Sequence, residues 1–399
     1  MHDDDVVRGI ESLPERFRGE ATVEARYRLC IGDIQRDVVI SKSRCKVGPV
    51  RGKADAEIVT DAATWKLIDE GRLSGIEAFA QRKLSVRGGI ERSLHFEPCF
   101  DRPDAGALRY SVERIDTGAA KISAVIAGDP HGEPLVLLHG LGASKSSWLT
   151  VVPQLAQHYR VIAIDLPGFG ASSKPRGRYN ARWFADHVFK LLDTLGYGRA
   201  FVAGNSMGGR IAQEMAMAEP GRVRGIVCLC PATAFSKRPM LLAARLARAE
   251  AGVIVSRLPR GQITDSLRQM FARPSRVEDA WFDAAVEDFL QVWRSPWARF
   301  AFFASARNIY LEEPEGDNGF WARLAAMRVP AYYIFGQRDY LISSRFSGRV
   351  SEALPNARVE VWRNCGHVPQ VEMPDRTARV MLEFFASTRA PKRKAAEAV

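Results

Sequence analysis

The sequence of 399 residues is poor in cysteine and has no long apolar run. Its six cysteines lack the density of a disulfide scaffold, which excludes a small disulfide-stapled secreted protein and favours a reducing, cytoplasmic location. No run of about 20 apolar residues occurs, so the sequence predicts no membrane-spanning helix. The acidic start, residues 1–5, lacks the apolar segment typical of a secretory signal.

Motifs for cofactors and metals are also missing. The sequence has no dinucleotide-binding fingerprint and no haem or flavin signature, so we expect neither a cofactor nor oxidoreduction. Four histidines outside the motifs described below show no metal-ligand spacing, so we expect no metal site. These are His95, His131, His158 and His187.

The charge is unbalanced toward basic residues. Lys and Arg number 57 against 46 Asp and Glu, which gives a formal net charge of +11. This charge favours contact with anionic membrane surfaces or with acidic substrates such as acyl-CoA. The basic residues are dispersed and do not gather on a nucleic-acid-binding motif, so we expect no nucleic acid partner. The sequence does not predict an oligomeric state.

The most informative motif is Gly204-Asn-Ser206-Met-Gly208. It lies between an apolar strand pattern, residues 200–203, and a helical pattern, residues 210–218. The turn between such elements is so tight that side chains at the two glycine positions would collide with backbone. A serine at the apex of a strand–turn–helix is strained and exposed, which is typical of a nucleophile.

Other motifs carry the groups that a nucleophilic serine needs, namely a base, an orienting acid and an oxyanion site. A buried strand pattern ends in the turn His139-Gly140. A later strand pattern ends at Asp339, and the loop after the next strand carries His367. The chain order Ser206, Asp339, His367, with these flanking elements, resembles the α/β-hydrolase family.

The resemblance implies a role for each motif. It makes Ser206 the nucleophile, His367 the general base and Asp339 the acid that orients the histidine. The backbone N–H groups of Leu141 and Met207 would form the oxyanion hole. Structural roles fall to His139, Gly140, Gly204 and Gly208, and to Asp165 in the loop after the following strand.

The sequence therefore predicts a serine hydrolase that cleaves the carboxylic ester or thioester of a lipophilic acyl substrate through an acyl-enzyme. Acyl transfer would use the same triad. The run Gly-Asn-Ser-Met-Gly-Gly also resembles the corresponding turn of carbon–carbon bond hydrolases that cleave ring-fission products. Those enzymes usually carry Gly-Pro-Gly after the oxyanion His-Gly, where this chain has Leu141-Gly-Ala-Ser. A non-catalytic lipid carrier with a vestigial hydrolase part is the remaining alternative.

The segment before the hydrolase motifs predicts a separate small domain. Its matching pieces are a strand at residues 54–61, a helix with Trp65, a helix with Ala78-Phe79 and a strand at residues 83–88. This series resembles a sterol-carrier-protein-type lipid-transfer domain, which implies an apolar tunnel for a fatty-acyl chain.

This second resemblance has one departure and one functional consequence. Gly89 stands where the family usually has an acidic residue. The short linker, residues 99–107, would keep the two cavities close, so we expect a lipid to be handed to the hydrolase. A small α+β domain that only packs against the hydrolase is the alternative.

We thus predict an α/β protein with two domains. A small α+β lipid-transfer-like domain spans residues 1–104. An α/β-hydrolase domain spans residues 105–388, with a mostly helical cap at about 236–325 and a resemblance that covers roughly 106–388. A disordered basic tail is expected at residues 389–399.

Overall fold

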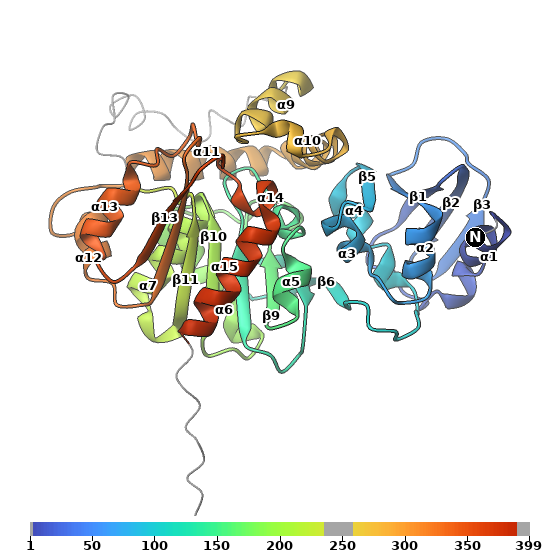
Figure 1. Ribbon diagram of the computed structural model, residues 1–399, viewed down its shortest axis with the longest axis horizontal. Helices are drawn as coiled ribbons and strands as arrows, with labels where there is room; N and C mark the ends of the chain where they lie inside the picture. The colour runs from blue at the N-terminus through green and yellow to red at the C-terminus, as the bar shows by residue number, and fades with distance from the viewer. Residues whose placement is uncertain (1–2, 235–257, 389–399) are drawn as a thin grey trace, which may run out of the picture.

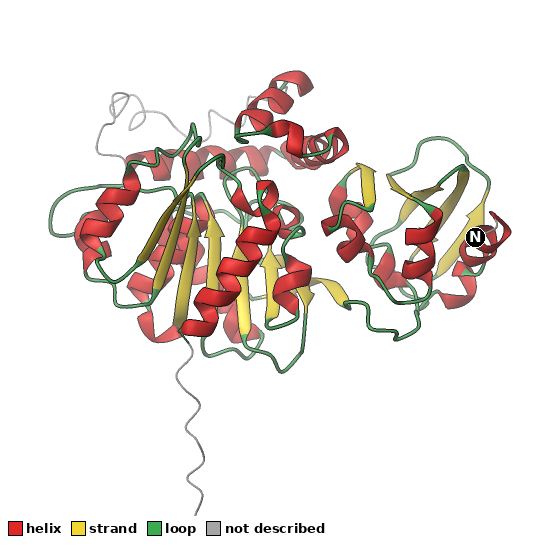
Figure 2. Cartoon of the chain, in the orientation of Figure 1, coloured by secondary structure: helices red, strands yellow, loops and turns green. Residues whose placement is uncertain are grey.

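The computed structural model describes residues 3–234 and 258–388, which form two sheets with helices around them (Figures 1 and 2). The first part of the expected cap, residues 236–257, and the expected basic tail, residues 389–399, lie outside the described residues. The fold is α/β, as predicted, with a smaller sheet preceding a larger one.

The N-terminal domain, which contains β1 to β5, holds a five-stranded sheet in the order β3-β2-β1-β4-β5. Its strands pair antiparallel except β1 with β4, which pair parallel. Alternate residues of β1 and β4 are buried, which accounts for the alternating sequence pattern. The elements are α1 (Asp3–Glu11), β1 (Ala25–Ile31), β2 (Ile34–Ser41), β3 (Arg44–Gly48), β4 (Ala56–Thr60), α2 (Ala62–Asp69), α3 (Gly75–Ala80), β5 (Leu84–Gly88) and α4 (Ile90–Leu94).

The C-terminal domain, which contains β6 to β13, holds an eight-stranded sheet in the order β13-β12-β11-β10-β8-β9-β7-β6. The strands from β13 to β9 in this order run parallel to one another. Strand β7 pairs antiparallel with β9 on one side and with β6 on the other. The strands are β6 (Tyr110–Asp116), β7 (Lys121–Ala127), β8 (Pro134–Leu138), β9 (Arg160–Ile164), β10 (Ala200–Asn205), β11 (Val223–Leu229), β12 (Ala331–Gly336) and β13 (Arg358–Trp362).

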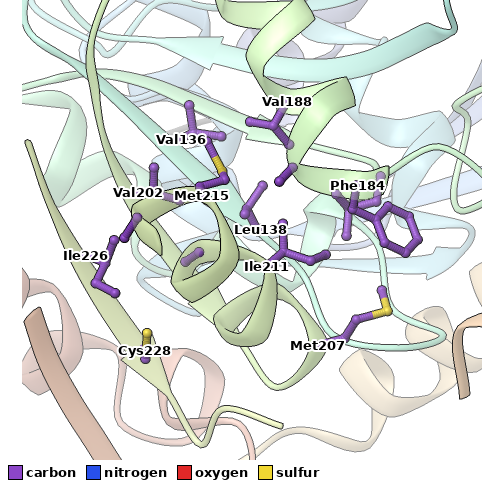
Figure 3. Close-up of a cluster of buried hydrophobic side chains, with 14 of the residues drawn as sticks. Val136, Leu138, Phe184, Val188, Val202, Met207, Ile211, Met215, Ile226 and Cys228 are labelled. Atoms are coloured by element: carbon purple, nitrogen blue, oxygen red, sulfur yellow. The ribbon is translucent and has the colours of Figure 1, made fainter. Parts of the chain in front are cut away.

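Helices cover both faces of this sheet, so its central strands are near-continuous apolar runs with every residue buried. Figure 3 shows one face, where Ile211 and Met215 of α7 pack against Val136 and Val202 of the strands. The helices outside the cap are α5 (Val152–Ala156), α6 (Ala181–Thr194), α7 (Met207–Ala218), α13 (Phe346–Ala353), α14 (Pro369–Glu372) and α15 (Pro374–Ser387).

The described part of the cap is helical, as predicted. It contains α9 (Arg260–Gln269), α10 (Asp279–Trp293), α11 (Pro296–Leu311) and α12 (Phe320–Ala325). In Figure 1, α9, α10 and α11 lie above the carboxyl ends of the strands of the large sheet, and α10 reaches toward the N-terminal domain.

The two domains share a hydrophobic core. Ile76, Ile90 and Leu94 of the N-terminal domain belong to the same buried cluster as Leu149 and Val152 of the C-terminal domain. Cap helix α10 packs beside β5, which is an edge strand of the small sheet. Covering an edge strand removes a surface prone to pairing with other chains. The N-terminal domain therefore docks on both the sheet domain and its cap.

Candidate active site

Ser206 lies in a tight turn between β10 and α7. Its φ of +54° and ψ of −116° place it in a region that residues other than glycine rarely adopt. A Cβ at Gly204 would stand 2.1 Å from the carbonyl oxygen of Gly208, and a Cβ at Gly208 would stand 2.1 Å from that of Leu138. Both glycines are therefore required by the close approach of backbone to backbone.

Asp339 and His367 form a pair after β12 and β13. His367 Nδ1 lies 2.7 Å from Asp339 Oδ2, and both side chains are almost fully buried. The other carboxylate oxygen, Oδ1, accepts hydrogen bonds from the N–H groups of Leu341 (2.8 Å) and Ile342 (2.9 Å). Because the carboxylate accepts the Nδ1 proton, Nε2 of the neutral ring carries the free lone pair.

Asn205 ties the serine turn to the histidine loop. Its Nδ2 atom donates to the carbonyl oxygens of His367 (2.9 Å) and Leu229 (3.1 Å). Ser206 and His367 also line one cavity. The structure thus brings the three residues expected to form a triad into one site. Asn205 was not predicted, although a polar residue ending an apolar strand was a visible signal.

Glu372 is a second residue that the sequence analysis missed. This buried carboxylate accepts hydrogen bonds from the N–H groups of Gly366 (2.7 Å) and Arg273 (2.8 Å). The N–H of His367 donates to the carbonyl of Met270 at 2.7 Å. These bonds join the histidine loop to the chain between α9 and α10, so the cap helps to place His367.

His139 fixes the peptide unit between Gly140 and Leu141. Its Nε2 accepts the N–H of Leu166 at 3.0 Å, so Nδ1 carries the proton and donates to the Gly140 carbonyl at 2.7 Å. Burial lowers the pKa of His139, which keeps the ring neutral. In a trans peptide the N–H points away from the carbonyl, so the ring sets the direction of the Leu141 N–H.

The two residues expected to supply oxyanion-binding N–H groups, Leu141 and Met207, lie close to the serine in the fold. A Cβ at Gly140 would stand 3.3 Å from Cβ of Ser206, and Leu141 lines the same cavity as Ser206. Met207 is the first residue of α7, so its N–H has no acceptor within the helix and lies at the positive end of the helix dipole.

A cavity of about 1030 Å³ opens on Ser206 and His367. Apolar side chains of α9, α10 and α11 line it, including Leu267, Val286, Phe289, Val292 and Phe302. The N-terminal domain lines another part of it, with Thr22, Ile90, Arg92 and His95. A large cavity with apolar walls and a few polar groups is typical of a site for a lipophilic small molecule.

A buried lysine links the loop after Leu141 to the N-terminal domain. Lys145 Nζ pairs with Asp165 at 2.8 Å and with Glu91 of α4. Burial opposes the charge, but the two carboxylates raise the pKa of Lys145 to about 12. Asp165 also accepts the N–H groups of Lys145 (2.7 Å) and Ala171 (2.8 Å), so its contacts are those of a structural residue.

Among the described residues, one group of side chains has the composition of a metal site. Ligand atoms of Cys230, Asp339 and His367 lie within 4.8 Å of one another. The Asp339 and His367 atoms, however, are 2.7 Å apart and hydrogen-bonded to each other, which is too close for two ligands about 2.0 Å from one tetrahedral ion. Burial also raises the pKa of Cys230 well above its ordinary value, so the thiol keeps its proton. These residues do not fit a metal.

Comparison with known proteins identifies the family. The profile of the alpha/beta hydrolase family matches residues 135–380, so the chain belongs to this family. The profile of the SCP-2 sterol transfer family matches residues 20–101. Both resemblances inferred from the sequence are thereby confirmed, as is the fold of the two domains.

The relatives act on different bonds. A 2-hydroxy-6-oxononadienedioate/2-hydroxy-6-oxononatrienedioate hydrolase of Burkholderia vietnamiensis is 31% identical, covering 63% of this chain and 87% of that protein. The dihydrolipoyllysine-residue acetyltransferase component of an acetoin cleaving system of Pseudomonas putida is 29% identical over 68% of this chain and 69% of that protein. The crystal structure of a bacterial membrane phospholipase A has a TM-score of 0.59 and 26% identity over 76% of this chain and 90% of that chain.

No helix in the described residues is long and apolar enough to cross a membrane.

Proposed function

We propose that this member of the alpha/beta hydrolase family cleaves the carboxylic ester, or thioester, of a lipophilic acyl substrate. One observation carries the proposal. Strained Ser206 opens on a large cavity with apolar walls, and the same cavity holds His367, whose Nδ1 is bonded to buried Asp339. The family match to a sterol-transfer domain and the likeness to a phospholipase support the lipophilic character of the substrate.

The first half of the reaction forms an acyl-serine. His367 Nε2 takes the Ser206 proton as Oγ attacks the carbonyl carbon, and Asp339 stabilises the imidazolium that results. The N–H groups of Leu141 and Met207 bind the oxyanion of the tetrahedral intermediate. His367 then gives the proton to the leaving alcohol or thiol as the bond to the carbonyl breaks.

The second half releases the acid. Water attacks the acyl-serine while His367 takes one of its protons, and the oxyanion again lies at the two backbone N–H groups. Collapse of this intermediate returns the proton to Ser206 Oγ and frees the carboxylic acid. No cofactor or metal enters any step.

The proposal includes a cytoplasmic location and peripheral contact with a membrane. All six cysteines are free thiols, which supports the cytoplasmic location expected from the sequence. The net charge of +11 supports peripheral contact with an anionic membrane as a source of substrate.

The test is hydrolysis of p-nitrophenyl esters from acetyl to palmitoyl by the wild type and by Ser206→Ala. Activity should rise with chain length up to an optimum, and the variant should lose on the order of a millionfold in kcat, as loss of a triad serine does elsewhere. Equal activity of both proteins would reject Ser206 as the nucleophile.

A second candidate is hydrolysis of a carbon–carbon bond in a ring-fission product. The relative at 31% identity is the observation that favours it. A 2-hydroxy-6-oxo-hexadienoate probe, followed by loss of its visible absorbance, separates the candidates. Turnover of this probe with no turnover of any ester would select the second candidate. Turnover of neither would favour a lipid carrier.

A further inference from the structure

Helix α4 separates two cavities. One is the active-site cavity described above, and the other is a cavity of about 80 Å³ inside the N-terminal domain. Glu91, Arg92 and His95 face the active-site cavity, whereas Leu94 faces the N-terminal one. Among the described residues, Ile90 alone lines both cavities, and its side chain is buried. Ile90 is therefore the described residue that borders both cavities.

The wall of the N-terminal cavity is built by both domains. Most of its lining is apolar and comes from the N-terminal domain, including Ile58, Ile76, Phe79, Leu84 and Val86. Leu149 and Tyr110 of the C-terminal domain complete it. The cavity has about half the volume of the apolar cavity of about 150 Å³ that accommodates benzene in another protein. It has room for the end of an acyl chain rather than for a whole lipid.

The cap holds α4 in this position. Gly89 precedes the helix as its N-cap and has no side chain to accept the N–H of Glu91, the second helical residue. Asp288 of α10 takes this role, because its two carboxyl oxygens lie 3.3 and 3.4 Å from the backbone nitrogen of Glu91. A Cβ at residue 89 would stand 2.8 Å from the Asp288 carboxylate. Gly89, where the sterol-carrier family usually has an acidic residue, thus leaves room for the Asp288 side chain of the cap.

The Glu91 side chain joins the same turn of α4 to the segment that follows Leu141. It pairs with Lys145, which follows Leu141 in the chain by one short turn. Helix α4 is therefore held by the cap, by the loop after Leu141 and by the shared core. Such a helix is a fixed wall of the catalytic cavity, and a lipid that moved between the cavities would have to pass Ile90.

We propose that Ile90 closes the distal end of the acyl-binding site, with the N-terminal cavity directly behind it, and so sets the longest chain accepted. The acyl chain of a bound substrate runs from Ser206 along the apolar cap toward α4. Its terminal methyl group meets Ile90, and a smaller side chain at this position would join the cavities. This inference rests on the proposed ester hydrolysis. It differs from transfer of a free lipid, because Ile90 keeps the two cavities of the wild type apart.

The test is the chain-length profile of Ile90→Ala, measured as kcat/KM for p-nitrophenyl esters and expressed relative to the acetyl ester. The optimum should move to chains about two to four carbons longer, with about a fourfold gain for each methylene newly buried. Ile90→Val removes one methylene and should give a smaller shift in the same direction. Ile40→Ala removes the same atoms from the N-terminal core away from both cavities, and it should not shift the optimum.

A second substitution distinguishes a joined cavity from a merely wider active site. Val86 lines only the N-terminal cavity, so Val86→Phe fills that space without altering the active-site wall. In the Ile90→Ala background it should abolish the shift. A shift that persists in the double variant, or no shift in Ile90→Ala and Ile90→Val, would overturn the proposal. Wild type that hydrolyses no ester would instead contradict the proposed function.

Discussion

At the scale of single residues, the site depends on side chains that fix the direction of others. Asp339 accepts two backbone N–H groups at one oxygen and the His367 ring at the other, so the carboxylate cannot rotate without losing bonds. His139 acts in a similar way on the peptide that carries the Leu141 N–H. Neither Asp339 nor His139 has to touch the substrate.

Asp339→Asn tests this arrangement. The amide would turn an N–H group toward His367 and select the tautomer whose Nε2 is already protonated, so kcat for ester hydrolysis should fall about 10⁴-fold. The measurement is kcat with a saturating ester, together with circular dichroism to show that the fold is retained. Asp193→Asn, on the surface of α6, is the matched control and should keep wild-type activity. A loss of less than tenfold in Asp339→Asn would contradict the assigned role.

At the scale of elements, the tight turn after β10 is the part of the site that local sequence predicts best. Its constraints are steric and fall on two glycines within five residues, so the glycine pattern reports them even though a Cβ at Gly208 would meet the distant Leu138. The order Ser206, Asp339, His367 is likewise visible because each residue follows a strand. Asn205 and Glu372 were missed because their bonds reach the histidine loop and the cap, which no local pattern reports.

Gly204→Ala tests the steric argument at this turn. The new Cβ would stand 2.1 Å from a backbone oxygen, so the turn must distort and the free energy of unfolding should fall by about 3 kcal/mol or more. Gly198→Ala is the control, because a Cβ there would meet nothing within 4 Å. The control should change stability by less than about 1 kcal/mol. Urea denaturation measures both, and equal effects would contradict the steric account.

At the level of the whole molecule, the two domains form one unit around the cavity that Ser206 and His367 line. The sequence predicted each domain from its own motifs, yet it could not predict how they dock. The bonds that join them link residues far apart in the chain, such as Glu91 with Lys145 and Glu91 with Asp288. Side chains of this kind look like ordinary surface charges in a sequence, and only the fold reveals that they meet inside an interface.

The Glu91 ion pair makes stability depend on pH. Burial opposes the charge of Glu91, but Lys145, with a smaller contribution from His95, outweighs it and holds the pKa at about 2, below the ordinary value of 4.5. Above pH 4.5 the pair contributes its full stability, which is lost as the pH falls from 4.5 toward 2 because the unfolded chain binds the proton first. The stability difference between wild type and Glu91→Gln should shrink by about 1.4 kcal/mol from pH 6 to pH 3.5.

Urea denaturation at the two pH values measures this difference. Glu352→Gln, at an exposed position, is the control and should show no such change. A difference between wild type and Glu91→Gln that stays constant over this range would show that the pair is not formed in solution.

In the proposed reaction, Ser206 carries the acyl group during turnover. Mass spectrometry of the protein, quenched in acid within milliseconds of mixing with p-nitrophenyl octanoate, tests it directly. We expect an added octanoyl mass on the peptide that contains Ser206, in an amount matching the burst of p-nitrophenol, and no added mass in Ser206→Ala. An octanoyl group on another residue, or a burst with the same acylation in Ser206→Ala, would contradict it.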